Sequence, residues 1–198
     1  MKKCLLIVCG LAFTLGLNAQ LRFGAKVGGT MSSMFLKEGN VTIDAAKARL
    51  GFLLGGMMEY SFTESFALQP ELLYVLNGAK FKALEGTLES TTSLHNIQLP
   101  VNLKYKMGVE GLKFYVTAGP SLSFIAGAKQ KSNNISVDLF EGDEGLKRID
   151  FGLGVGLGVE ISKIAIGLNY NYGLSNIAKG SNSTTRTGTF ALSVGYFF

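Results

Sequence analysis

Alternation of apolar residues with small or polar ones runs through most of the chain, and it constrains the fold more than any other feature. In FGLGVGLGVEI (151–161), Phe, Leu, Val and Ile occupy every second position and four glycines lie between them. A period of two residues is the period of a β-strand, and helical spacing does not produce it. The pattern predicts eight strands and an all-β fold, in the segments 21–30, 49–61, 65–77, 94–107, 112–124, 151–161, 164–173 and 187–198.

The connections between these segments alternate between short and long. Residues 62–64, 108–111 and 162–163 have room only for tight turns. Short turns at one end and long loops at the other are typical of an up-and-down barrel of the outer membrane. We therefore expect residues 20–198 to form one membrane-spanning antiparallel barrel domain of eight strands in a bacterial outer membrane. The long polar connections, expected as surface loops, are 31–48, 78–93, 125–147 and 174–186.

The composition of the two strand faces indicates which one points outward. One face is almost entirely Leu, Ile, Val and Phe, and the other is mostly Gly, Ala, Ser and Asn with scattered charges. A soluble ligand-binding barrel, the rival interpretation, would coat its outside with charged residues instead. Eight strands enclose only enough room for side chains, so small residues suit the interior. We expect the apolar face to lie in lipid, where closure of the barrel satisfies the backbone polar groups.

Aromatic residues are expected to form a girdle at each membrane interface, although the chain contains no Trp. The periplasmic girdle would comprise Tyr60, Phe66, Tyr105, Phe114, Tyr196 and Phe198. The girdle near the loops would comprise Tyr74, Phe124, Phe151, Tyr170, Tyr172 and Phe190.

Residues 1–19 have the three parts of a secretory signal peptide. Two lysines are followed by an apolar stretch, 5–17, and by Ala19 as a small residue for cleavage. The apolar stretch is short for a membrane-spanning helix, which needs about twenty residues. We expect cleavage after Ala19.

Both cysteines, Cys4 and Cys9, would be removed with this leader, so the mature chain would contain no disulfide. Loss of Lys2 and Lys3 lowers the formal net charge from +5 to +3 (5 − 2). A small and scattered positive charge gives no support to a nucleic-acid partner.

Several stretches together resemble the PorT-like outer-membrane β-barrel family of Gram-negative bacteria. They are QPELLYVLNGAK (69–80), NIQLPVNLKYK (96–106) with FYVTAGPSLSF (114–124), DFGLGVGLGVEI (150–161) and LNYNYGLSNI (168–177). The resemblance extends from about Leu21 to Phe198, and it implies an eight-stranded barrel in the outer membrane. One founding member of that family is associated with the type IX secretion machinery, whereas most other members have no assigned activity. The resemblance therefore predicts location and fold rather than a specific role.

Charged residues on the predicted interior face form the candidate site. Buried charges persist when they are paired, so we expect a structural network that fills the lumen. Glu71 and Lys104, on neighbouring strands, are expected to form one of its pairs. The alternative is a narrow path for ions or small solutes. The expected network comprises Lys26, Glu59, Glu71, Lys104, Lys106, Asp150 and Glu160, with Arg22, Arg49 and Lys113 on the same face.

Catalysis and metal binding have little support in the sequence. His95 is the single histidine, and beside Ser90, Ser93 or Asp44 it would be a candidate base of a lipid-modifying enzyme. A girdle residue is the preferred interpretation of His95. The acidic segment EGDEG (141–145) is interpreted as a solvated loop rather than a cation site. We expect no catalytic residue, no cofactor and no metal.

The expected function is that of an integral outer-membrane protein with a structural or interaction role. Its surface loops or periplasmic turns would contact an envelope or secretion protein, and the barrel would be a monomer. Two further partners are expected: outer-membrane lipid, and the barrel-assembly machinery through the C-terminal strand that ends at Phe198. The alternatives are a narrow channel and a lipid-modifying enzyme.

Overall fold

The computed structural model describes residues 21–38, 41–43, 46–82, 89–109, 111–132, 135–138, 148–176 and 183–198. The expected leader lies outside these ranges, as do Asp44 and the acidic segment 141–145. Eight long strands make up the fold: β1 (Leu21–Glu38), β3 (Ala46–Ser61), β4 (Phe66–Lys82), β5 (Glu89–Val109), β6 (Leu112–Ser132), β8 (Ile149–Ile161), β9 (Ile164–Gly173) and β10 (Ser183–Phe197). Two short strands, β2 (Val41–Ile43) and β7 (Ile135–Asp138), pair with β1 and β6.

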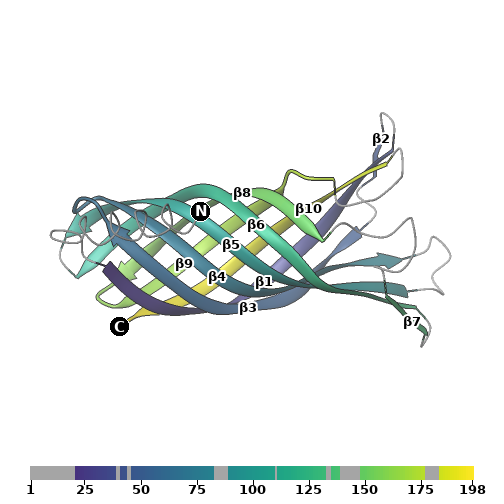
Figure 1. Ribbon diagram of the computed structural model, residues 1–198, viewed down its shortest axis with the longest axis horizontal. Coiled ribbons are helices and arrows are strands. Elements are labelled where there is room, and N and C mark those ends of the chain that lie inside the picture. Colours follow the sequence, from purple (N-terminus) through teal and green to yellow (C-terminus); the bar gives the residue numbers. More distant parts are fainter. Residues whose placement is uncertain are drawn as a thin grey trace, which may run out of the picture.

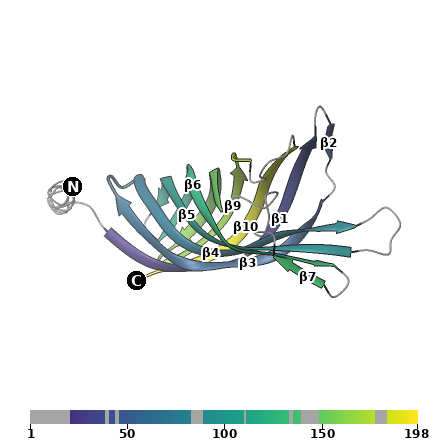
Figure 2. The same ribbon diagram turned by 45° about the vertical axis from the view of Figure 1, so that its right-hand side comes forward.

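The eight long strands form a closed antiparallel barrel, as predicted (Figure 1). Each strand pairs with the next long strand in the chain, and β10 returns to pair with β1 from Gly24 opposite Phe197 to Glu38 opposite Ser183. Closure leaves no unpaired edge within the barrel wall. In Figure 2, β1 begins and β10 ends at the same end of the barrel, the end that carries the short turns. No helix in the described ranges is long and apolar enough to cross a membrane.

The connections predicted as long loops are largely strand, and that prediction was wrong for much of their length. The strands continue past the apolar band, and Figures 1 and 2 show them flaring away from the barrel. Beyond the membrane both faces of a strand meet water, so strand pairing no longer requires apolar alternation. In 89–93 and 183–186, paired threonines also favour extended backbone. Strand replaces the expected loop at 31–38, 46–48, 78–82, 89–93, 125–132 and 183–186.

The apolar face of the barrel points outward, as predicted. Exposure alternates along β8, where the Leu157 side chain is 59% exposed whereas Glu160 on the other face is 4% exposed. The glycines of β8 face a narrow interior. A Cβ added at Gly158 would overlap the Ile166 backbone oxygen and the Tyr115 ring. A β-carbon does not fit at this position unless the backbone moves, which accounts for glycine on the inner face.

Aromatic side chains stack in pairs at both ends of the apolar band. At the turn end, the ring centroids of Phe66 and Tyr105 lie 4.9 Å apart. At the loop end, those of Tyr170 and Phe190 lie 4.4 Å apart. These separations are typical of stabilising aromatic pairs.

Candidate functional site

Five charged side chains meet inside the turn end of the barrel: Arg22 from β1, Glu59 from β3, Lys104 and Lys106 from β5, and Glu160 from β8. They occupy inward positions of their strands because strand side chains alternate between the two faces. The Glu59 carboxylate is fully buried and accepts hydrogen bonds from Arg22 at 2.6 Å and from Lys104 and Lys106 at 2.8 Å. Glu160 accepts from Arg22 at 2.8 Å and from Lys104 at 3.1 Å. We call these five residues the charge layer.

Polar and aromatic groups complete the charge layer. Its three cations and two carboxylates leave one formal positive charge (3 − 2). The Lys106 ammonium also donates to the Ser61 hydroxyl at 3.1 Å. The Arg22 guanidinium lies 4.2 Å from the ring centroid of Phe197, and the Lys104 ammonium lies 4.3 Å from that of Tyr115. Cations over aromatic faces are stabilised by the ring quadrupole, most strongly where water is excluded.

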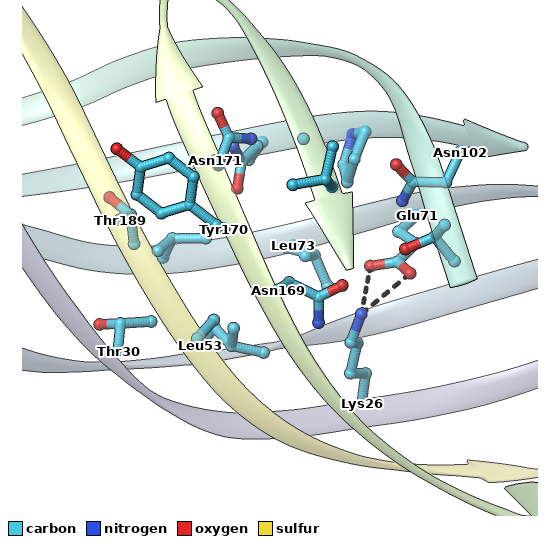
Figure 3. Close-up of a pocket in the computed structure, with 17 residues that line it drawn as sticks. Lys26, Thr30, Leu53, Glu71, Leu73, Asn102, Asn169, Tyr170, Asn171 and Thr189 are labelled. Carbon is cyan, nitrogen blue, oxygen red and sulfur yellow. Dashed lines mark hydrogen bonds and ion pairs between the residues drawn. The ribbon is translucent and has the colours of Figure 1, made fainter. Parts of the chain in front are cut away.

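Lys26 and Glu71 form a separate pair farther along the lumen. The Lys26 ammonium donates to both Glu71 carboxylate oxygens at 2.9 Å (Figure 3), and the Gln69 amide also donates to Glu71. The predicted pair of Glu71 with Lys104 is wrong. The register places Lys104 opposite Ala67, four residues before Glu71, which corresponds to about 13 Å along the strand. Lys104 therefore reaches the charge layer instead.

A small cavity adjoins the Lys26–Glu71 pair. Its volume is about 50 Å³, room for only a few water molecules. Figure 3 shows polar side chains from several strands around it, including Asn102, Asn169 and Asn171. Asn171 on β9 exchanges hydrogen bonds with the Ser121 hydroxyl on β6 at 2.8 and 3.2 Å, over Gly152 of the intervening strand β8. The lumen is therefore lined by hydrogen bonds as well as by ion pairs.

Asp150 and Arg49 lie apart from the charge layer, near the loop end. The Thr187 hydroxyl donates to Oδ2 of Asp150 at 3.1 Å, and Arg49 donates to the Ser93 hydroxyl at 2.6 Å. The seven residues predicted as one network thus lie in three places. Glu59, Lys104, Lys106 and Glu160 meet in the charge layer, Lys26 pairs with Glu71, and Asp150 is separate.

Comparison with protein families matches residues 14–179 to the outer membrane protein beta-barrel domain, and this match covers most of the chain. The chain belongs to that family. A comparison with curated proteins finds no match. The family and the closed barrel together place the protein in the bacterial outer membrane.

Solved outer-membrane barrels share the fold at low sequence identity. The outer membrane protein OprG from Pseudomonas aeruginosa is 14% identical with a TM-score of 0.55, over 89% of this chain and 95% of that one. The outer membrane enzyme PagL is 12% identical with a TM-score of 0.51, over 86% and 98%. Neisserial surface protein A is 15% identical with a TM-score of 0.50, over 89% and 97%. These outer-membrane barrels support the fold of the chain and leave its specific role open.

His95 lies on the outer face of this outer-membrane barrel, next to an irregularity in the β5–β6 pairing between His95 and Asn96. Its Nδ1 atom forms a hydrogen bond with the Tyr74 hydroxyl. The hydroxyl of Ser93, one of the partners considered for a catalytic His95, accepts from Arg49.

The sequence analysis assigns no role to several inward residues of the barrel. Phe197 is almost fully buried against Arg22, whereas the prediction for this strand concerns Phe198. Inward amides, which the strand pattern predicts as filling residues, supply much of the polar lining. The alternation that predicts which charged residues face the lumen also predicts that these amides do, because side chains alternate between the two faces of a strand. They are Gln69, Asn77, Asn96, Asn102, Asn169 and Asn171.

Proposed function

We propose that this outer-membrane barrel is non-catalytic and non-conducting, and that it acts as a structural or interaction protein that contacts a partner at one of its ends. The charge layer is the observation that carries the proposal. Glu59 is fully buried within 2.8 Å of three cationic groups from two other strands. A permeating ion would have to separate these groups, and breaking a buried ion pair is strongly unfavourable.

The shape of the loop end supports an interaction role. β3, β4, β5 and β6 remain paired beyond the apolar band, which gives the protein an ordered surface outside the membrane. Residues that bind partners are often carried on segments that a rigid scaffold positions. The turn end offers a smaller surface, formed by the turns that follow β3, β5 and β8.

The resemblance to PorT-like barrels supports placing the chain in that branch of the family and looking for its partner in the cell envelope. A component of an envelope secretion machine is the first partner to test. If the gene lies next to secretion genes, a secretion component becomes the preferred partner over other envelope proteins.

The interaction role is tested by photo-crosslinking in intact cells. A photoreactive residue replaces Leu174 near the loop end, Phe62 at the turn end, or Leu157 on the lipid face, all of which are exposed. We expect a discrete adduct with one envelope protein from Leu174 or Phe62, and lipid adducts only from Leu157. Lipid adducts alone from all three positions would contradict an interaction role.

Two rival functions have their own tests. A narrow channel would produce steady conductance steps in planar bilayers. A lipid-modifying enzyme would alter lipid A or phospholipids in a manner that depends on His95. We expect cells carrying His95→Ala to show the same lipid composition as cells with the unchanged protein.

A further inference from the structure

Unpaired buried oxygen atoms lie together in the lumen near the loop end. Among the buried side-chain nitrogen and oxygen atoms of the described residues, four have no hydrogen-bond partner: Oε1 of Gln69 and Oδ1 of Asn77, Asn96 and Asp150. The last three residues line one cavity of about 20 Å³. Leaving a buried polar atom unsatisfied costs about 1–3 kcal/mol. Three such residues around one cavity therefore indicate that it holds water or another small ligand.

Hydrogen bonds with two threonines of β10 engage one polar atom each of Asn77 and Asp150 and leave the other unpaired. The Asn77 amide nitrogen donates to the Thr189 hydroxyl at 3.3 Å, which leaves its Oδ1 atom unused. The Thr187 hydroxyl donates to Oδ2 of Asp150 at 3.1 Å, which leaves the other carboxylate oxygen unused. Asp150 and Asn96 are only 7% and 6% exposed, so bulk water does not satisfy them.

Asp150 also differs from the other buried carboxylates. Glu59, Glu71 and Glu160 each contact at least one Lys or Arg side chain. In the part of the chain that the structure describes, no such ion pair forms at Asp150. A buried carboxylate without a cationic neighbour either takes up a proton or binds a positive partner, and a metal cation would be such a partner.

We propose that this cavity binds a single hard metal cation, with Asp150 as its charged ligand and the amide oxygens of Asn77 and Asn96 as neutral ligands. Carboxylate and amide oxygens are the ligands that Ca²⁺ prefers, and the Thr187 and Thr189 hydroxyls also line the cavity. A cavity of about 20 Å³ exceeds the roughly 10–15 Å³ that one water-sized occupant needs. It is too small for the several waters that Mg²⁺ usually retains.

The site would join strands far apart in the sequence. Asn77 lies on β4, Asn96 on β5 and Asp150 on β8, so one cation would cross-link the loop end of the lumen. Gly173 on β9 makes room for the acidic ligand. A Cβ at this position would overlap the Thr187 hydroxyl and would lie 2.7 Å from Oδ2 and 3.3 Å from Oδ1 of Asp150. Gly173→Ala therefore displaces the carboxylate and the Thr187 hydroxyl that donates to it, while leaving the charge in place.

The test uses the refolded barrel in detergent, stripped with EDTA and then titrated with CaCl₂ by calorimetry and by thermal unfolding. We expect one saturable site. With a single carboxylate ligand, its Kd should be about 10⁻⁴–10⁻³ M, the range of weak extracellular calcium modules. MgCl₂ should bind more weakly. Asp150→Asn, which keeps the shape of the side chain, should weaken Ca²⁺ binding by at least about 100-fold.

Thermal unfolding separates a cation ligand from a purely structural aspartate. Asp150→Asn should be at least as stable as the unchanged protein in EDTA, because it removes an uncompensated charge, and less stable in CaCl₂. Asn96→Ala and Gly173→Ala should each weaken Ca²⁺ binding by about 10-fold or more. Glu64→Gln, in an exposed turn, is the matched control and should bind as the unchanged protein does.

Two results would overturn the proposal. One is the absence of saturable Ca²⁺ binding up to about 10 mM, well above the expected Kd range, which would mean that the cavity holds water only. The other is equal Ca²⁺ binding by the unchanged protein and by Asp150→Asn, which would place any bound cation elsewhere.

Discussion

Replacing Glu59 with Gln should remove a large part of the stability of the barrel. The Glu59 carboxylate is the shared partner of Arg22, Lys104 and Lys106. In the variant, Arg22 and Lys104 retain Glu160, whereas Lys106 retains the Ser61 hydroxyl as its contact among the described residues. One buried ammonium is then left without a carboxylate.

The expected cost follows from that single unpaired charge. Removing one partner of a buried ion pair costs about 3–5 kcal/mol. The contact with Ser61 places the cost near the lower limit, about 3 kcal/mol, or roughly a hundredfold in the unfolding equilibrium. The double variant Glu59→Gln/Lys106→Gln removes the unpaired charge and should recover most of the loss.

Urea unfolding in phospholipid vesicles measures this prediction, with heat-modifiable gel migration as the readout of folded barrel. The control is Glu64→Gln in an exposed turn, which should change the free energy of unfolding by less than about 0.5 kcal/mol. A loss below about 1 kcal/mol in Glu59→Gln would refute the reasoning. A double variant less stable than the single one would refute it too.

Three further variants probe other parts of the barrel. Gly167→Ala should lose about 1–3 kcal/mol in the same unfolding assay, because a Cβ there would overlap the Tyr115 hydroxyl, and adding Tyr115→Phe should restore stability. Leu157→Arg, near the middle of the lipid-facing side of β8, should cost about 2–4 kcal/mol, whereas Ile161→Arg at the turn end should cost about 1 kcal/mol or less. Phe198→Ala should reduce the folded barrel recovered from outer membranes of cells, since we expect the assembly machinery to recognise the terminal aromatic residue, with little effect on refolding into vesicles.

Each of these predictions has a contradicting result. Tyr115→Phe that fails to rescue Gly167→Ala would mean that the hydroxyl is not the obstacle. Equal costs at Leu157 and Ile161 would argue against a lipid-facing gradient along β8. If cells assemble as much folded barrel from Phe198→Ala as from the unchanged chain, the assembly machinery does not recognise Phe198.

The number of long strands, their order and the outward orientation of the apolar face were predictable from the sequence because the lipid bilayer imposes them. Lipid requires an apolar outer face along every crossing strand, and the narrow interior requires small residues on the other, so the period of two is visible in segments such as 151–161. That constraint ends at the membrane surface. The strand continuation at 89–93, ESTTS, carries no apolar alternation, so the sequence pattern predicts a loop there.

The pairing of the interior charges was only partly predictable. The alternation predicts which residues face the lumen, but it does not predict at which depth along the barrel axis each one lies. Depth depends on the stagger between tilted strands, which the inter-strand register determines. Lys104 and Glu71 are on adjacent strands, yet that register directs Lys104 to Glu59 and Glu160 and leaves Glu71 to Lys26.

Single-channel recording in planar bilayers tests most directly whether the charge layer closes the barrel. We expect no steady conductance steps from the unchanged protein. A variant in which the five residues of the charge layer, together with Lys26 and Glu71, are replaced by Ala should conduct, because the ion pairs at both levels of the lumen are gone. Steady steps of equal size from both proteins would contradict a closed lumen and support the channel instead.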